Sequence, residues 1–212
     1  MVDHPGVLRG LAVIILAAGA SRRFGRENKL LQPYRGKPLM SHILHAVEQL
    51  DVVLRLVVTG PPYADEVKQL LCAHHGWQEC LNPNALQGMG TSIAAGAKQL
   101  GAHRGVFICP ADMPDIGAED FRETGALFQD RSSLCRPTYN ESPGHPVLFG
   151  SAHFQNLRNL NGVNGGAVLI RDATTPVRTY ASSNSGVIRD FDTPAQFEAI
   201  TRSLEERIQR RS

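Results

Sequence analysis

The chain has 212 residues, of which 42% are hydrophobic, 22 are Lys or Arg and 20 are Asp or Glu. This length and hydrophobic content predict one folded domain over residues 1–212 and exclude a disordered chain. A net charge of +2 provides no global field for nucleic acid or for a membrane surface, so any anion-binding site must be local. No apolar run approaches the ~20 residues of a membrane-spanning helix, and the four cysteines form no C-x-x-C pair. We therefore expect reduced thiols, a cytoplasmic location, and neither nucleic acid nor membrane as a partner.

The hydrophobic pattern predicts strands that alternate with helices along the chain. Residues 1–10 are expected to be a flexible leader. Continuous or alternating apolar runs predict strands at 11–16, 52–58, 79–81, 105–109, 133–137, 145–149 and 187–191. Helical periodicity predicts helices at 38–50, 63–72, 91–100, 120–128, 165–171 and 193–207. Thr91 or Ser92 is expected to cap the third helix. This alternation predicts an α/β fold with a mostly parallel sheet and helices on both faces.

Ligands of such folds bind at the carboxyl ends of the strands. That rule selects the loops after Leu16, after Cys109 and after Phe191.

The first of these loops has the features of a phosphate-binding loop. The small residues "AAG" after Leu16 allow a flat ligand to approach the backbone, and Gly19 can adopt a positive φ. Positive charge suited to a triphosphate follows at Arg22, Arg23, Arg26 and Lys29. The spacing matches neither the P-loop nor the dinucleotide fingerprint. The alternative is a solvated basic loop whose glycines serve only for turning.

The other two loops carry carboxylates. "CPADMP" places Asp112 just after a buried strand, between two prolines. A carboxylate beside a triphosphate suits Mg²⁺, although aspartate also caps turns. "RDFDTP" supplies Asp190 and Asp192, either of which could be a second metal contact, and Asp192 or Thr193 is expected to cap the terminal helix.

Five segments together resemble a known family. "LAAGASRRFGRENKLLQPYRGKPLM" (16–40) is similar to the signature L-A-A-G-x-S-x-R-M-G…K-L-L…G-x-P-L of the molybdenum cofactor nucleotidyltransferases, and especially to their cytidylyltransferase branch. The resemblance continues in "NPNALQGMGTSIAAG" (82–96), "CPADMP" (109–114), "PTYNESPGHPVLF" (137–149) and "RDFDTPAQF" (189–197). These motifs span nearly the whole chain in the family's order.

The resemblance implies a Rossmann-like nucleotidyltransferase fold and a Mg²⁺-dependent transfer of a nucleotide from an NTP to the phosphate of molybdenum-bearing molybdopterin. It implies a nucleotide pocket formed by Leu16, Ala17, Ala18, Gly19, Ser21, Arg23, Lys29, Gly88 and Ser92. Catalysis would fall to Arg23, Lys29 and Asp112, and metal binding to Asp112, Asp190 and Asp192. The acceptor would contact Gly144, His145, Pro146 and Asn164. Ala18 favours CTP, because the guanylyl branch usually reads L-A-G-G.

The sequence departs from the family pattern at two places. Phe24 replaces a usual methionine, and Val163, next to Asn164, stands where an acid is common. The acceptor could therefore differ, and a related transferase using GTP or another phosphate acceptor stays open. A molybdoenzyme or its maturation chaperone is an expected transient partner.

Readings from other classes also stay open. One is a non-catalytic nucleotide or molybdopterin carrier acting as a chaperone, which the intact Lys29 and Asp112 disfavour. Another is a Rossmann oxidoreductase, which lacks its fingerprint. His74 and His75 have no third ligand at metal spacing in the sequence, so we expect a surface or turn role for them.

Overall fold

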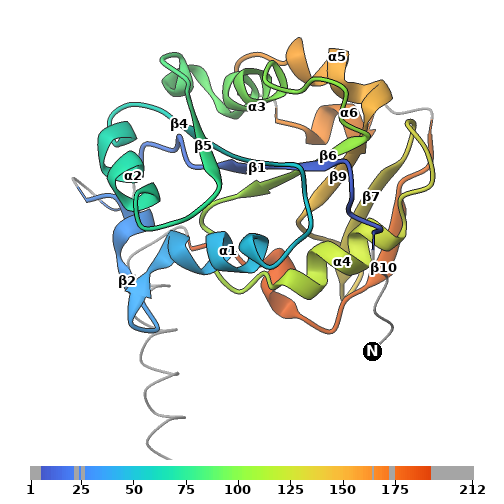
Figure 1. Ribbon diagram of the computed structural model, residues 1–212, viewed down its shortest axis with the longest axis horizontal. Helices are drawn as coiled ribbons and strands as arrows, with labels where there is room; N and C mark the ends of the chain where they lie inside the picture. The colour runs from blue at the N-terminus through green and yellow to red at the C-terminus, as the bar shows by residue number, and fades with distance from the viewer. Residues whose placement is uncertain (1–5, 22–23, 25–26, 164, 172–174, 192–212) are drawn as a thin grey trace, which may run out of the picture.

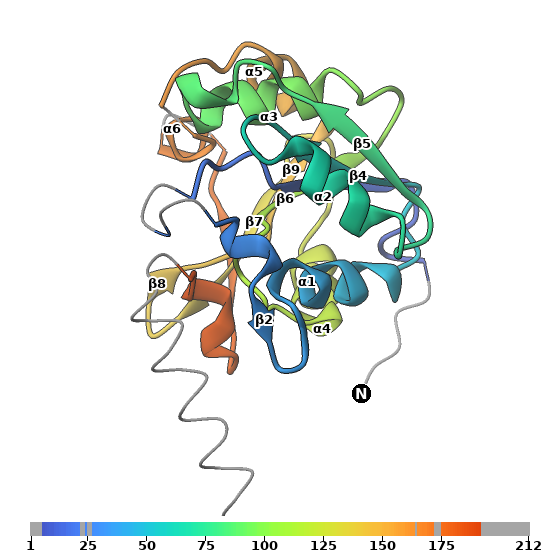
Figure 2. The same ribbon diagram turned by 90° about the vertical axis from the view of Figure 1, so that its left-hand side faces the viewer.

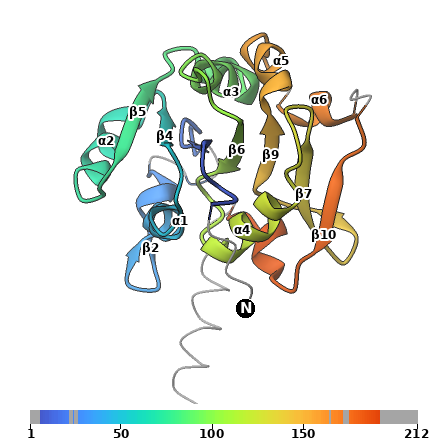
Figure 3. The ribbon, with the colours of Figure 1, turned by 45° about the vertical axis from the view of Figure 1, so that its right-hand side comes forward.

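The computed structural model describes residues 6–21, 24, 27–163, 165–171 and 175–191. Its centre is one sheet with the strand order β10-β7-β9-β6-β1-β4-β5, in which β8 pairs with β7 at the side. The strands are β1 Leu11–Leu16, β4 Leu54–Thr59, β5 Trp77–Leu81, β6 Gly105–Pro110, β7 Leu134–Tyr139, β8 Ser142–Pro143, β9 Val147–Gly150 and β10 Arg178–Ala181. Figure 3 shows β5, β4, β6, β9, β7 and β10 side by side across the view.

The sheet is mostly parallel. Strands β6, β1, β4 and β5 are mutually parallel, and β10 is parallel to β7. Strand β9 runs antiparallel to both β6 and β7, and the short β8 is antiparallel to β7. A separate two-stranded ribbon pairs β2, Pro33–Tyr34, with β3, Lys37–Pro38.

Helices cover both faces of the sheet, as the sequence predicts (Figures 1 and 2). One face carries α1 Leu39–Glu48, α2 Ala64–Leu71 and α4 Ala118–Ala126, and the other carries α3 Met89–Ala97, α5 Phe154–Arg158 and α6 Ala167–Arg171. Strand β1 supplies both cores, because its successive side chains point to opposite faces. Val13 and Ile15 pack with α1, while Ala12 and Ile14 pack with α3. The continuous apolar run 11–16 is thus explained by burial on both sides.

Most predicted elements are confirmed with ends shifted by a few residues, but three expectations are wrong. Residues 187–191 form no strand. A 3₁₀ turn, Ser185–Ile188, occupies this segment, because the side chain of Asn184 accepts a hydrogen bond from the Gly186 amide. Thr91 and Ser92 do not cap α3, which already begins at Met89 after Gly88. Part of the expected leader packs on the core, since Leu8 is buried against Gly125.

Several short elements have no counterpart in the sequence-based prediction. They include the edge strand β10, whose residues are only partly buried, the short helix α5 and the two-residue strands β2, β3 and β8. The predicted terminal helix 193–207 lies outside the described residues. Within the part of the chain that the structure describes, no helix is long and apolar enough to cross a bilayer.

Substitution of Phe107 tests the hydrophobic core between the sheet and α4. Its side chain is fully buried in β6 and packs edge-on against Phe121 of α4, with ring centroids 5.3 Å apart. We expect Phe107→Ala to lower the free energy of unfolding by about 3–5 kcal/mol, because it leaves a cavity. Val53→Ala, at a residue 59% exposed, should change it by less than about 0.5 kcal/mol. Urea denaturation of both variants checks this. An equal loss of unfolding free energy in the two variants would contradict the assigned core.

Candidate active site

The ends of β1 and β6 bring two predicted site loops together. The strands are neighbours in parallel register, with Leu16 opposite Pro110. The amide of Ala111 then donates to the carbonyl of Leu16 at 3.0 Å, so the two loops leave the sheet side by side. On the other side of β1, the amide of Ala17 donates to the carbonyl of Val58 at 2.8 Å. The loops after β1 and β6, which the strand-end rule selected separately, therefore form one candidate binding place.

Lys29 reaches this place from a short 3₁₀ turn, Lys29–Leu31. The side chain of Asn28 caps that turn by accepting a hydrogen bond from the Leu30 amide at 3.1 Å. The Lys29 amide donates to Ser21 Oγ at 3.3 Å, which ties the turn to the first loop. Ser21 itself has a φ of 45°, a conformation that non-glycine residues rarely adopt.

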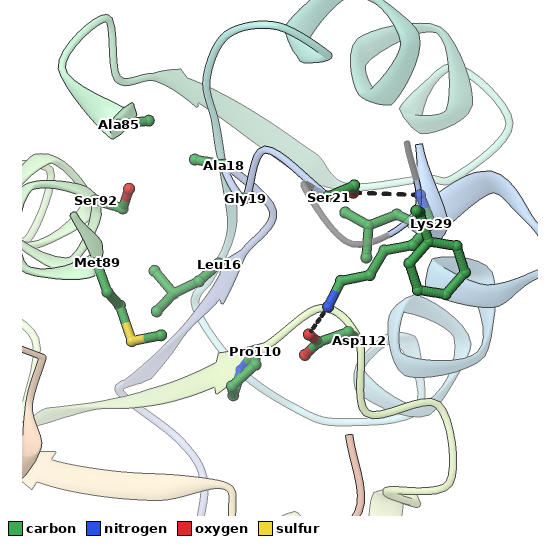
Figure 4. A pocket seen from close by; sticks show the side chains of 12 residues that line it. Leu16, Ala18, Gly19, Ser21, Lys29, Ala85, Met89, Ser92, Pro110 and Asp112 are labelled. Carbon is green, nitrogen blue, oxygen red and sulfur yellow. Dashed lines mark hydrogen bonds and ion pairs between the residues drawn. The ribbon is translucent and has the colours of Figure 1, made fainter. Parts of the chain in front are cut away.

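The lysine and the predicted metal ligand form an ion pair. Lys29 Nζ lies 2.5 Å from Asp112 Oδ2, and both side chains are largely buried (Figure 4). The carbonyl of Asp112 accepts a hydrogen bond from the Phe191 amide at 3.1 Å. This bond brings the third predicted loop to the same place, although it follows a 3₁₀ turn and not a strand.

A cavity of about 400 Å³ lies over these loops. In Figure 4 Ala18 and Gly19 form one side, Ser92 and Met89 of α3 lie opposite, and Lys29 extends toward Asp112. The cavity walls are formed by Leu16, Ala18, Gly19, Ser21, Phe24, Lys29, Leu30, Ala85, Met89, Ser92, Pro110 and Asp112. Its walls combine small and apolar residues with the Lys29 cation and the Asp112 carboxylate, which suits a nucleoside that carries phosphates.

A second cavity of about 240 Å³ shares Leu16, Met89 and Pro110 with the first. It is mostly apolar, and its polar wall consists of Arg136 and His145. The ring atom Nδ1 of His145 is buried and has no hydrogen-bond partner among the described residues. Burial, aided by the nearby Arg136 cation, lowers the pKa of His145 to about 4, so its imidazole is neutral at pH 7.

A network of hydrogen bonds and ion pairs, most of them partly buried, fixes the chain after Asp112. Asp115 accepts hydrogen bonds from the Tyr34 hydroxyl at 2.9 Å and pairs with Arg35 at 3.1 Å. Asn184 Nδ2 donates to the Asp115 carbonyl at 2.9 Å and to Asp120 Oδ2 at 2.8 Å. The β2–β3 ribbon, α4 and residues 182–189 thus hold the turn that carries Asp112.

The structure brings most of the predicted site residues together. Those that line the first cavity are Leu16, Ala18, Gly19, Ser21, Lys29, Ser92 and Asp112. Ala17 is buried beside the cavity, and Gly88 lies before α3 with its positive φ, packed against the Gly162 backbone. Asp190 is exposed and directly precedes Phe191. Their contacts with a nucleotide or a metal stay predictions.

On the acceptor side, His145 lines the second cavity, whereas Gly144 packs against the Val187 carbonyl and Pro146 is buried. Val163 is 83% exposed. The remaining predicted residues, Arg23, Asn164 and Asp192, lie outside the described residues, as do Arg22 and Arg26.

Sequence reasoning missed Met89 and Arg136. Met89 lines both cavities; it lies in the segment 82–96 that resembles the family, but its residue type gives no sign of a site role. Arg136 is a lone charge within the strand sequence "LCRPTY", which is a detectable signal. Its guanidinium donates twice to the Gly144 carbonyl, at 2.9 and 3.1 Å, and so anchors the "GHP" turn.

Asp112 also fits a divalent metal ion. Its Oδ1 is buried with no hydrogen-bond partner among the described residues, while Oδ2 faces Lys29. Hard divalent cations prefer carboxylate oxygens of this kind together with phosphate oxygens and water.

A mostly parallel sheet with a lysine–aspartate pair in a cavity over the ends of its central strands is the arrangement expected of a nucleotidyltransferase domain. The chain belongs to the MobA-like NTP transferase domain family, whose model matches residues 13–178.

Among curated proteins, the chain is 39% identical over 156 residues to a probable molybdenum cofactor guanylyltransferase of Pyrococcus horikoshii, covering 72% of this chain and 73% of the relative. It is 29% identical over 190 residues to the bifunctional protein GlmU of Rhizorhabdus wittichii, covering 89% of this chain. The chain spans only 39% of the length of that GlmU protein.

Solved structures show the same fold. The homologue of Mycobacterium tuberculosis Rv0371c from Mycobacterium sp. strain JC1 has a TM-score of 0.80 at 24% identity, covering 93% of this chain and 98% of that one. Rv0371c of M. tuberculosis H37Rv, solved as a complex with manganese, has a TM-score of 0.71 at 22% identity, covering 91% and 98%.

His145 makes stability depend on pH. Its pKa is near 6.5 in an unfolded chain and about 4 in the fold, so its stabilising contribution is full above pH 6.5 and is lost as the pH falls toward 4. We expect the shifted pKa of this residue to lower the free energy of unfolding by roughly 2 kcal/mol between pH 7 and pH 5. Urea unfolding at both pH values should show a smaller loss in His145→Asn. An unchanged loss in that variant would contradict the buried neutral imidazole.

Proposed function

We propose that this chain transfers a CMP unit from CTP to the terminal phosphate of molybdenum-bearing molybdopterin and releases pyrophosphate. The observation that carries the proposal is the convergence of Lys29 and Asp112 in the wall of a cavity at the ends of β1 and β6. The family and the motifs of the sequence support the reaction class.

The cavity offers separate environments for the two ends of a nucleotide. Ala18, Ala85 and Ser92 form a small, mostly apolar part in which a base and ribose fit. Lys29 and Asp112 lie at the other end, where a triphosphate needs a cation and a metal ligand. In this proposal Lys29 exchanges its contact with Asp112 for one with the phosphates when the nucleotide binds.

The reaction needs no protein base. An ionised phosphate oxygen of the acceptor attacks the α-phosphorus of CTP, the new P–O bond forms, and the bond to the β-phosphate oxygen breaks. Pyrophosphate leaves with the electron pair. The protein contributes alignment of the attacking and leaving oxygens and stabilisation of negative charge, for which Lys29 is placed.

Nucleotidyltransferases of this family typically use a divalent metal ion. We propose Mg²⁺ here, held by Asp112 with help from Asp190 or Asp192. When bound, it neutralises charge on the triphosphate. The orphaned Oδ1 of Asp112 supports this assignment, because a buried carboxylate oxygen without a partner is costly.

The second cavity is the proposed acceptor site. It shares the wall residues Leu16, Met89 and Pro110 with the first cavity, so an acceptor phosphate held there would lie next to the nucleotide. Its apolar wall suits a planar heterocycle, and neutral His145 and Arg136 offer polar contacts. A molybdoenzyme or its maturation chaperone is the proposed recipient of the product in the cytoplasm.

Two observations bear on the choice of base. The Ala18 methyl group lines the cavity and narrows it relative to glycine, which favours the smaller cytosine. Against this, the relative from P. horikoshii is named a guanylyltransferase. GTP is therefore the second candidate nucleotide.

Lys29→Ala and Asp112→Asn test the catalytic pair. Each is expected to lower kcat for pyrophosphate release at least ~100-fold, the scale for removing one charge-stabilising group. Asp112→Asn keeps the side-chain shape, so circular dichroism should stay unchanged. Lys98→Ala and Asp51→Ala, at exposed residues outside both cavities, should keep wild-type turnover. Near-wild-type turnover in either test variant would refute the assigned roles.

A comparison of the four NTPs tests which nucleotide base the chain prefers. With Mg²⁺ and molybdenum-loaded molybdopterin, CTP should give the highest kcat/KM for pyrophosphate release, and Ala18→Gly should raise the relative rate with GTP. Equal or better use of GTP by the wild type would reject the cytidylyl assignment. Nucleotide binding without pyrophosphate release from any NTP would instead favour a carrier.

A further inference from the structure

A second cluster of metal-ligating side chains lies on helix α1 and the segment that follows α2. His45 and Glu48 occupy one face of the last turn of α1, three residues apart. His74 follows α2 and is buried against them. Among the described residues, these are the one group of three or more His, Cys, Asp or Glu side chains whose ligand atoms lie close enough to hold a metal ion together.

The three side chains converge through their ligand atoms. His74 Nδ1 lies 2.9 Å from Glu48 Oε1, and His45 Nδ1 lies 3.0 Å from Glu48 Oε2. All three ligand atoms lie within 4.8 Å of one another. Ligands of a tetrahedral zinc ion, at about 2.1 Å from the metal, lie about 3.4 Å apart, so a modest rotation of a side chain completes the geometry. His45 has the freedom for it, because its side chain is 44% exposed.

Glu48 is available as an anionic ligand. Partial burial opposes its ionisation, but hydrogen bonds from His74, His45 and Trp77 outweigh this effect and lower its pKa. The indole Nε1–H of Trp77 donates to Glu48 Oε1 at 3.1 Å. Such a contact orients a carboxylate ligand from outside the coordination shell.

The outer nitrogens of both imidazoles also have neighbours. His74 Nε2 lies 3.2 Å from Ser41 Oγ, which can accept a hydrogen bond from the Nε2–H when Nδ1 binds a metal. His45 Nε2 lies 3.3 Å from Lys37 Nζ. Lys37 is exposed and can turn to solvent when the ring proton moves from Nδ1 to Nε2.

We propose that His45, Glu48 and His74 bind one divalent transition-metal ion of the zinc class. Two imidazoles and one carboxylate suit zinc and its neighbours in the first transition row, whereas Mg²⁺ prefers oxygen ligands alone. Three protein ligands leave a fourth position for water, on the side where His45 is exposed. The sequence shows no third ligand near His74 and His75, because the other two ligands are supplied by α1, about 26 residues earlier.

This site lies beside the amino ends of β4 and β5, at the end of the strands opposite to the active site. Trp77 begins β5 opposite Arg55 of β4, and Arg55 donates to the carbonyls of Val47 and Leu50 at the end of α1. Lys29 and Asp112, by contrast, lie at the carboxyl ends of the strands. The ion would join α1 to the start of β5, so its expected effect is on stability and not on turnover.

Trp77 is the chain's single tryptophan and reports on this site alone. We expect ZnCl₂ titrated into the untagged full chain, in millimolar Mg²⁺ to occupy carboxylate sites, to change Trp77 fluorescence with a stoichiometry of one ion per chain. Zn²⁺ should also raise the Tm. His45→Ala, at a partly exposed residue, and Glu48→Gln should weaken binding at least ~100-fold while the chain stays folded.

His75→Ala is the matched control, because His75 is adjacent to His74 but exposed. It should bind Zn²⁺ as the wild type does. Wild-type protein whose Trp77 fluorescence and Tm do not respond to Zn²⁺ would overturn the proposal. So would unchanged affinity in both His45→Ala and Glu48→Gln, or an equal loss of affinity in His75→Ala.

Discussion

The pairing of β1 with β6 is the constraint on which the site depends. Their parallel register places Leu16 opposite Pro110, and the bond from the Ala111 amide to the Leu16 carbonyl continues the ladder into the loops. Two segments about 95 residues apart in the chain therefore begin their loops at one point. The ion pair of Lys29 with Asp112 follows from that placement, since each side chain lies on a turn anchored to one of these loops. Polar groups on β2, α4 and residues 182–189 then restrict the Asp112 turn, so the carboxylate is held in place before any ligand arrives.

The two cavities suit different substrates of the proposed reaction. They share Leu16, Met89 and Pro110 and differ in character, since the first contains the charged pair and the second is mostly apolar with a neutral imidazole. A donor nucleotide and an acceptor phosphate in these places would meet at the shared wall. Preorganised positions of this kind lower a barrier chiefly by orienting the reactants. The proposed zinc-class site stands apart from this chemistry, beside the amino ends of β4 and β5.

Much of this could be predicted from the sequence. The run 11–16 is apolar at every position because both of its faces are buried, so β1 was predicted with its observed bounds. The position of Asp112 after β6 followed from the same pattern. Segment 187–191 misled the prediction because Val187, in a 3₁₀ turn, and Phe191, just after it, are both buried, a pattern that periodicity does not distinguish from a short strand. The edge strand β10 was missed because its pairing partner β7 lies about 40 residues earlier, and its own residues are half exposed. The cluster of His45, Glu48 and His74 depends on how α1 packs beside the α2–β5 segment, which no local pattern encodes.

The central claim is that Lys29 and Asp112 together hold one metal-bound nucleotide triphosphate. A crystal structure of the chain with Mn²⁺ and a CTP analogue carrying a methylene group between its α- and β-phosphates tests it most directly. We expect an anomalous manganese peak coordinated by Asp112 Oδ1, with the triphosphate in contact with Lys29 Nζ and the base beside Ala18. A nucleotide bound away from this cavity, or a manganese ion on the triphosphate without Asp112 among its ligands, would contradict the claim.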